Sequence, residues 1–228
     1  MTPSIDVWHL SLAAARERFD DSMMLLSEDE RQRAERFVYP EDAARFALCR
    51  ATLRAILGEA TGSPPRELTF EYGPSGKPRV ADAIAFNIAH TRELMVCAVS
   101  RDVADLGIDL ERIDTTTDVD VVVKHSFSPA ERDYLSRLEG ADRRRAFFQC
   151  WTRKEAYLKA RGEGLNAPLT EVNTLSNPSG WTLKDLLIDD THACCIAFHS
   201  ARAAEFTISR WCGSPRPQTR TASTESSH

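Results

Sequence analysis

Similar segments recur along this chain at a nearly constant separation of about 100 residues. The pattern Ser-x-x-Glu-Arg begins at Ser27 and again at Ser128, and an apolar strand pattern over 95–100 recurs over 195–200. The other two pairs are the helix patterns that begin at Asp42 and Asp142, and the strand patterns Ile5-Asp6-Val7 and Ile108-Asp109-Leu110. A fixed separation across four elements indicates internal duplication. We therefore predict an α+β fold of two similar halves, residues 1–104 and 105–213, with a disordered Ser/Thr/Pro-rich tail over 214–228.

Composition restricts the class of protein. With 228 residues, 42% hydrophobic and 28% charged, the chain is long enough to bury a substantial core. Its net charge of −5 argues against a nucleic-acid binder. No apolar run is long enough to span a bilayer, and the first residues lack the pattern of a signal peptide. The six cysteines form no C-x-x-C pair, so we expect reduced core residues in a cytoplasmic protein.

The predicted strand Gly107–Glu111 carries two acids on one face. Side chains alternate along a strand, so Asp109 and Glu111 point the same way while Ile108 and Leu110 point into a core. Taken alone, the pair suits two solvated surface acids. Neighbouring carboxylates also suit a hard divalent cation such as Mg²⁺, which binds one or two carboxylates together with phosphate oxygens. Only the second half keeps the acids, because Trp8 and Ala55 stand where Glu111 and Glu155 would repeat. A single site at the junction of the halves is therefore expected.

The helix pattern around Trp151 supplies a third acid and a cation. Glu155 and Lys159 are four residues apart and share a helix face, at the edge of an apolar stripe that includes Phe147 and Trp151. An ordinary surface salt bridge would explain Glu155 and Lys159 by themselves. Together with Asp109 and Glu111, they fit a site for Mg²⁺ and a diphosphate.

Several further residues are candidates for binding phosphate groups. His90 follows Asn87 in a short segment, and Lys77 lies in the glycine-containing loop Gly76-Lys77-Pro78. A structural histidine and a surface turn are the ordinary explanations of these two. Arg33 and Arg45 lie on predicted helices, where a solvated face is the default, although in an acidic chain they suit a local basic pocket.

Ordered blocks of this sequence resemble those of Sfp-type 4′-phosphopantetheinyl transferases. The blocks are Phe86–Thr91, Gly107–Glu111, Phe127-Ser128-Pro129-x-Glu131 and Trp151-x-x-Lys154-Glu155-Ala156-x-x-Lys159, with Arg36-Phe37 and Gly76-Lys77-Pro78 in similar places. The resemblance covers about residues 25–170. It implies two α+β halves related by pseudo-twofold symmetry, with the active site at their interface.

The resemblance also implies an activity. The enzyme would transfer 4′-phosphopantetheine from coenzyme A to a serine of an apo acyl- or peptidyl-carrier protein and release 3′,5′-ADP. Asp109, Glu111 and Glu155 would hold Mg²⁺, and Glu155 and Lys159 would be the catalytic residues. Arg33, Arg45, Lys77, His90, Lys154 and Lys159 would bind coenzyme A. Ala89 departs from the family, in which many members have serine before the histidine, so we expect weaker ligand binding.

Two other classes of function remain open. Acids followed by Glu-x-x-x-Lys also suit another Mg²⁺-dependent phosphoryl-transfer enzyme or a nuclease, and the chain could instead be a non-catalytic module that binds carrier proteins. The acidic net charge disfavours the nuclease, and the complete set of acids with Lys159 disfavours the inactive module. A site between two halves of one chain favours a monomer. The sequence does not identify the carrier protein, its pathway or the preference for Mg²⁺ over Mn²⁺.

Overall fold

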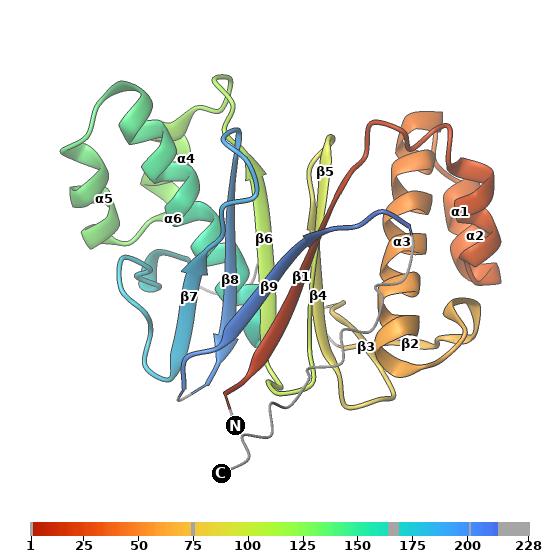
Figure 1. Ribbon diagram of the computed structural model, residues 1–228. Coiled ribbons are helices and arrows are strands. Elements are labelled where there is room, and N and C mark those ends of the chain that lie inside the picture. Colours follow the sequence, from red (N-terminus) through yellow and green to blue (C-terminus); the bar gives the residue numbers. More distant parts are fainter. Residues whose placement is uncertain (1, 74–75, 164–168, 201, 214–228) are drawn as a thin grey trace, which may run out of the picture.

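The computed structural model describes residues 2–73, 76–163, 169–200 and 202–213, so the predicted tail over 214–228 lies outside the described residues. The fold is of the α+β class. Two sheets lie face to face in the centre, with α1–α3 on one outer side and α4–α6 on the other (Figure 1). Among the described residues, no helix is long and apolar enough to cross a membrane.

The first part of the chain builds one helical layer and most of one sheet. Its elements are β1 (Ser4–Ser11), α1 (Phe19–Leu25), α2 (Glu28–Glu35), α3 (Pro40–Thr61), β2 (Phe70–Tyr72), β3 (Pro78–Val80), β4 (Ala85–His90) and β5 (Leu94–Ser100). The sheet has the strand order β4-β5-β1-β9. Its outer strand β9 (Glu205–Arg210) comes from the far end of the chain and pairs with β1 in parallel. The last strand therefore completes the sheet of the first part.

The second part builds the other layers. Its elements are β6 (Leu106–Arg112), α4 (Val119–Ser126), α5 (Pro129–Ser136), α6 (Gly140–Arg161), β7 (Trp181–Asp185) and β8 (His192–His199). The antiparallel sheet has the order β6-β8-β7. The helix α6 packs on its outer face, where Ala156 and Ala160 share a core with Cys195 and Ala197.

The inner faces of the two sheets form a shared apolar core. Ile5, Val7 and Val96 from one sheet pack with Ile108 and Leu110 from the other. At the edge of this core β4 lies beside β6, and the side-chain oxygen of Asn87 accepts a hydrogen bond from the backbone N–H of Ile108 at 2.8 Å. Below, the seam means this line of contact between β4 and β6.

The spacing of about 100 residues reappears in the helices. The helices α3 and α6 have 22 residues each, begin 100 positions apart, and end at Gly62 and Gly162, which both adopt the left-handed conformation. The shorter helices α2 and α5 have eight residues each and begin with capping boxes, in Ser27–Glu30 and Ser128–Glu131. The duplicated pattern in the sequence therefore corresponds to helices of equal length and equal capping.

The capping-box acids also make corresponding buried ion pairs. Glu30 pairs with Arg54 of α3, and Glu131 pairs with Lys154 of α6, exactly 100 positions after Arg54. Each cation also donates to backbone carbonyls of the segment that follows its helix. These acceptors are Pro65, Arg66 and Leu68 for Arg54, and Leu169 and Val172 for Lys154. The same device therefore fixes a short helix and a following loop to each long helix.

Two local expectations differ from the structure. The strand expected over 171–176 is replaced in the described residues by a 3₁₀ turn, Leu169–Glu171, followed by irregular backbone. Carbonyls of this segment accept from Lys154, so they are directed at a side chain and not at a neighbouring strand. The stretch from Asp114 to Asp120, expected as a polar linker, contains the start of α4, where Asp118 accepts a hydrogen bond from the N–H of Val121 as an N-cap.

The closest approach between the sheet and α6 is at Gly107. A Cβ atom on Gly107 would lie 2.1 Å from the carbonyl oxygen of Ala156 and 2.4 Å from the backbone nitrogen of Ala160. Both atoms belong to the backbone of α6, so rotation of a side chain cannot relieve the overlap. Only glycine lets α6 lie this close to β6.

We predict that Gly107→Ala lowers the free energy of unfolding by at least ~2 kcal/mol, because the added methyl group forces α6 away from β6. Urea denaturation of the purified variant measures the change. Gly73→Ala is the control, since its nearest neighbour would be 3.8 Å away, and its midpoint should stay close to that of the wild type. Equal midpoints for Gly107→Ala and the wild type would contradict the close packing.

Candidate active site

Asp109 and Glu111 lie on the face of β6 that is covered by α6. Alternation along β6 sends Leu106, Ile108 and Leu110 into the core between the sheets and directs the acids the other way. Asp109 is buried, and its Oδ1 atom lies 2.6 Å from the Nζ atom of Lys159. Because Gly107 admits α6 so closely, short acidic side chains of β6 reach the side chains of the helix.

Two carboxylate oxygens in this cluster are buried without a hydrogen-bond partner among the described residues. They are Oδ2 of Asp109 and Oε1 of Glu155. Lys159 is one turn after Glu155 on α6 and interacts with the other oxygen of Asp109, while its own side chain is 32% exposed. A buried acceptor that lacks a donor is destabilising, so this cluster has the capacity for one more positive group.

The pKa values describe the same excess of negative charge. Burial raises the pKa of Glu155, and the charge of Asp109 raises it further. The pKa of Asp109 is also raised by burial, although Lys159 opposes the shift. Burial and the charge of Asp109 raise the pKa of Glu111 to about 7, against a lowering by the hydrogen bond from Trp151. Asp109, Glu111 and Glu155 therefore interact as one electrostatic cluster, as the sequence predicted.

The donors suit a hard cation in kind, but the structure does not assemble them as a coordination set. Carboxylate oxygens are the ligands that Mg²⁺ prefers, and two of them here are unpartnered. Within the part of the chain that the structure describes, however, no three His, Cys, Asp or Glu side chains are arranged to hold a metal ion. The metal assignment of Asp109, Glu111 and Glu155 therefore stays a prediction.

His90 is placed at the end of β4, beside the acidic strand. Its side chain is exposed, and Nδ1 lies 3.3 Å from the carbonyl oxygen of Thr91. The preceding Ala89 is buried in the core between the sheets. The strand β4 is antiparallel to β5, and the short connection from β5 to β6 turns the chain back again, so β4 and β6 run in the same direction. His90 therefore lies at the same end of the seam as Glu111.

Lys77 crosses from the first part of the chain to the second. Its Nζ atom donates to the carbonyl oxygens of Leu106 at 2.8 Å and Ala160 at 3.1 Å. Burial lowers the pKa of Lys77 to about 8. A cavity of about 530 Å³ lies next to it and is lined also by Arg79, Phe86, Arg101 and Asp105. Lys77 thus holds its loop against the C-terminal end of α6.

Arg33 and Arg45 are placed on the helical layer of the first part and not at the acidic cluster. The guanidinium of Arg33 lies 5.1 Å from the centre of the Phe46 ring. Arg45 forms an ion pair with Asp42, three residues earlier on α3. These interactions leave both side chains partly accessible at one end of α3.

The structure contradicts the assignment of Lys154 to phosphate binding. The Lys154 side chain is fully buried, 2.7 Å from Oε2 of Glu131, and its ammonium also donates to the carbonyl oxygens of Leu169 and Val172. Glu131 is equally buried and accepts from the N–H and hydroxyl of Thr174. On a helix, neighbouring residues point in different directions, so Lys154 faces the core while Glu155 faces β6.

Two contributions at this site were not expected from the sequence. Trp151, interpreted as part of an apolar stripe, forms a hydrogen bond with Glu111. Glu131, interpreted as a helix cap, is the counterion of Lys154. The second was detectable in principle, since Arg54 and Lys154 follow the repeated Ser-x-x-Glu pattern at matching positions.

We predict that Lys154→Met lowers the free energy of unfolding by about 3–5 kcal/mol, because it leaves the carboxylate of Glu131 buried without a counterion. Urea denaturation measures this. Lys124→Met, at an exposed position of α4, should change the value by less than ~0.5 kcal/mol. An unchanged stability of Lys154→Met would return this lysine to the ligand-binding candidates.

We predict that the stability gained in Glu111→Gln depends on pH. The folded pKa of Glu111 is raised from 4.5 to about 7, so the unfolded chain releases this proton first and wild-type stability decreases as pH rises between these values. Glutamine has no such loss. Measured without divalent cations, the variant should be more stable than the wild type at pH 8, and the difference should shrink toward pH 4.5. A difference that is constant with pH would contradict the raised pKa.

Comparison with known proteins agrees with the resemblance noted in the sequence. Residues 105–211 match the model of the 4′-phosphopantetheinyl transferase superfamily. Residues 11–102 match the model described as 4′-phosphopantetheinyl transferase, N-terminal.

Curated relatives cover most of the chain. The 4′-phosphopantetheinyl transferase HetI of Nostoc sp. is 35% identical over 211 residues, which are 86% of this chain and 88% of the relative. A 4′-phosphopantetheinyl transferase of Bacillus subtilis is 32% identical over 81% of this chain and 80% of its own length. The transferase Sfp of Bacillus subtilis strain 168 is 28% identical over 78% of this chain and 77% of its own length. The chain therefore belongs to the 4′-phosphopantetheinyl transferase superfamily.

Proposed function

We propose that this protein transfers the 4′-phosphopantetheine group of coenzyme A to a serine of an apo acyl- or peptidyl-carrier protein and releases 3′,5′-ADP. Similarity to named 4′-phosphopantetheinyl transferases over more than four fifths of the chain carries the proposal. The cluster of Asp109, Glu111, Glu155 and Lys159 beside the seam supports it, because this chemistry requires a positioned base and local positive charge near a diphosphate.

In this proposal the serine hydroxyl attacks the phosphorus that bears the pantetheine group. A new serine Oγ–P bond forms, and the bond from that phosphorus to the bridging oxygen of the diphosphate breaks. Glu155 accepts the hydroxyl proton, and its raised pKa makes it a stronger base than an ordinary carboxylate. Lys159, which is partly exposed, neutralises the phosphate of the departing 3′,5′-ADP.

Mg²⁺ is part of the proposal through the unpartnered oxygens of Asp109 and Glu155, with Glu111 as the third carboxylate. When bound, the ion would neutralise charge on the diphosphate. His90 would contact a phosphate group at the end of the seam. Arg33 and Arg45 would bind the 3′-phosphate, and Lys77 would hold its loop in place for the ligand. Lys154 has no direct role, because it is buried on Glu131.

We further propose that the two halves, 1–104 and 105–213, are related by pseudo-twofold symmetry with the active site between them. Equal lengths and left-handed caps of α3 and α6 support this relation. The corresponding ion pairs Glu30–Arg54 and Glu131–Lys154 support it independently. The site stays within one chain, so we propose a monomer in the cytoplasm.

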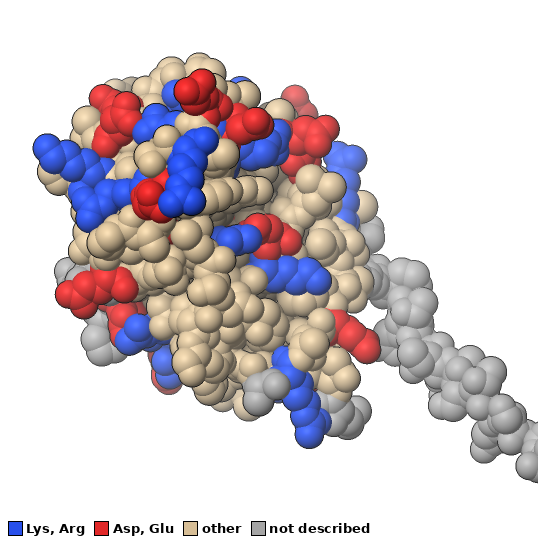
Figure 2. Space-filling model, turned by 90° about the vertical axis from the view of Figure 1, so that its left-hand side faces the viewer, with Lys and Arg blue, Asp and Glu red and all other residues tan. Residues whose placement is uncertain are grey.

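The carrier protein would dock on the segment after Asp114 and on α5. Basic and acidic side chains are intermixed on the face that bears α4–α6 (Figure 2), and no sign of charge dominates it. This face resembles a protein-binding surface more than a nucleic-acid-binding one, which requires a broad basic region. The mixed face and the net charge of −5 disfavour the alternative of a nuclease.

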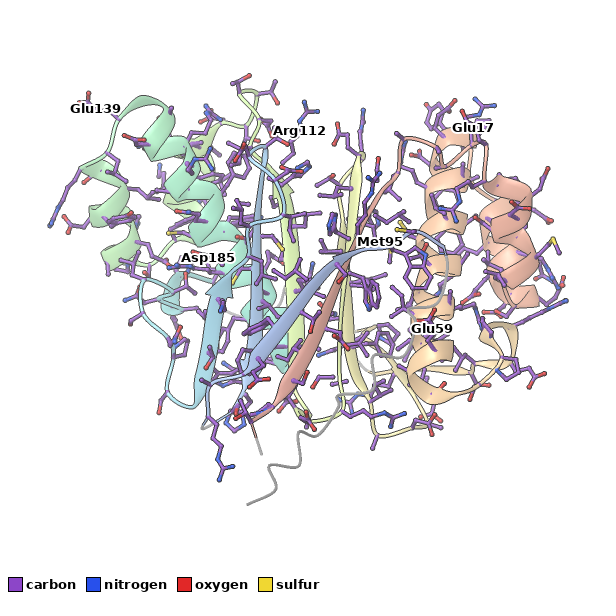
Figure 3. All side chains as sticks on the ribbon, viewed as in Figure 1. Glu17, Glu59, Met95, Arg112, Glu139 and Asp185 are labelled. Atoms are coloured by element: carbon purple, nitrogen blue, oxygen red, sulfur yellow. The ribbon has the colours of Figure 1, made fainter. Side chains whose placement is uncertain are left out.

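We predict that incubation with coenzyme A, Mg²⁺ and a panel of apo carrier proteins adds one phosphopantetheine mass to a carrier serine, measured by intact-protein mass spectrometry. Glu155→Gln should reduce the rate at least ~100-fold, because the base and a carboxylate for the ion are lost. Glu139→Gln is the matched control, at the opposite end of α6 (Figure 3), and should retain the wild-type rate.

A second readout separates the metal from the chemistry. Mg²⁺ should raise the thermal midpoint of the wild type and leave that of Glu155→Gln unchanged, without any substrate present. Binding of coenzyme A with no transfer to any carrier would favour the non-catalytic module. Cleavage of nucleic acid that requires Glu155 would favour the nuclease.

A further inference from the structure

A buried histidine lies at the end of the seam, outside the cluster proposed for catalysis. His192 is the first residue of β8 and is 8% exposed. Its Nδ1 atom lies 3.0 Å from both carboxylate oxygens of Asp189, and its Nε2 atom lies 3.4 Å from the hydroxyl of Thr91. Asp189 and His192 belong to the second part of the chain and Thr91 to the turn between β4 and β5. A continuous chain of polar contacts therefore connects the two parts.

The geometry orients the imidazole ring. Asp189 is itself held in place, since it accepts the backbone N–H groups of Thr191 and His192 at 2.7 and 2.9 Å. A carboxylate next to Nδ1 assigns the ring proton to that atom. The lone pair of Nε2 is then directed at Thr91 and accepts its hydroxyl proton.

Thr91 in turn fixes the turn that follows His90. Its hydroxyl oxygen accepts the backbone N–H groups of Glu93 and Leu94, each at 3.2 Å. The turn is joined to the second part a second time, by an ion pair at 2.6 Å between Glu93 and Arg112. That pair is exposed and contributes little, so the buried contact of His192 is the stronger of the two.

The contact lies where the proposed ligand groups of the two parts meet. His192 pairs with Arg112 in the β6–β8 ladder, one position beyond Glu111. Arg112 is at the end of the seam, between the two groups of helices (Figure 3). On the other side, Thr91 directly follows His90. The contact between Thr91 and His192 therefore passes across the end of β6 and sets the distance from His90 to the strand of the acids.

We propose that His192 is a positioning residue for coenzyme A: with Asp189 it holds Thr91, and thereby His90, in a fixed place relative to the carboxylates of β6. The inference rests on the proposed function, in which His90 contacts a phosphate group of coenzyme A. Small displacements of a ligand-binding group reduce its contribution strongly. Since Glu155 and Lys159 are held by α6, loss of His192 weakens binding and leaves the chemical step intact.

The test is steady-state kinetics of His192→Leu with coenzyme A varied and the carrier protein saturating. The KM for coenzyme A should rise about fivefold, the effect of one net hydrogen bond, with kcat within about twofold of the wild type. His199→Leu is the matched control at the opposite end of β8, where the ring packs against Trp181, and should leave both constants unchanged. In a His90→Ala background, His192→Leu should produce no further rise in KM, which a merely structural role would not predict.

An unchanged KM in His192→Leu, or an equal additional rise in the His90→Ala background, would overturn the proposal. If His192→Leu does not fold, Thr91→Val removes the hydroxyl from the same contact and should give the same rise in KM. If the wild type modifies no carrier, the proposed function fails first. The contact itself is then tested by a double-mutant cycle of Thr91→Val and His192→Leu in urea unfolding: non-additive changes support it and additive changes overturn it.

Discussion

The packing of α6 directly on Gly107 is the constraint on which the candidate site depends. A side chain at this position would overlap the backbone at Ala156 and Ala160. Because glycine removes that obstacle, Asp109 reaches Lys159 at 2.6 Å, and its charge raises the pKa values of Glu111 and Glu155. A larger separation would expose these acids to water, where they would behave as ordinary surface carboxylates.

A second device positions both long helices. In each part of the chain, the acid of a capping box pairs with a buried cation of the long helix, and the cation also donates to carbonyls of the following loop. A buried ion pair is stable only when its remaining hydrogen-bonding groups are satisfied, and the carbonyls satisfy them here. The device therefore fixes helix and loop together, and only the second part adds acids on the facing strand.

The seam is held by polar contacts of three kinds. Asn87 bonds the backbone of β6, Lys77 bonds carbonyls of β6 and α6, and Thr91 contacts His192 across the end of β6. Apolar packing between the two sheets brings the parts together without specifying their register to within an ångström. Directional hydrogen bonds supply that precision, and they place the exposed His90 at the same end of the seam as Glu111.

The sequence by itself determined the α+β class, the long helices, the acidic strand and the family, because periodicity, capping patterns and ordered motifs are local properties of the chain. It also predicted that Asp109, Glu111, Glu155 and Lys159 would act together. Only the tertiary structure decided between Lys154 and Lys159. Both are lysines on one helix, and the sheet under α6 and the segment around Leu169 determine which is buried. The role of His192 was likewise hidden, because its partner Thr91 is 101 positions away, and such distant contacts arise only when the whole chain has folded.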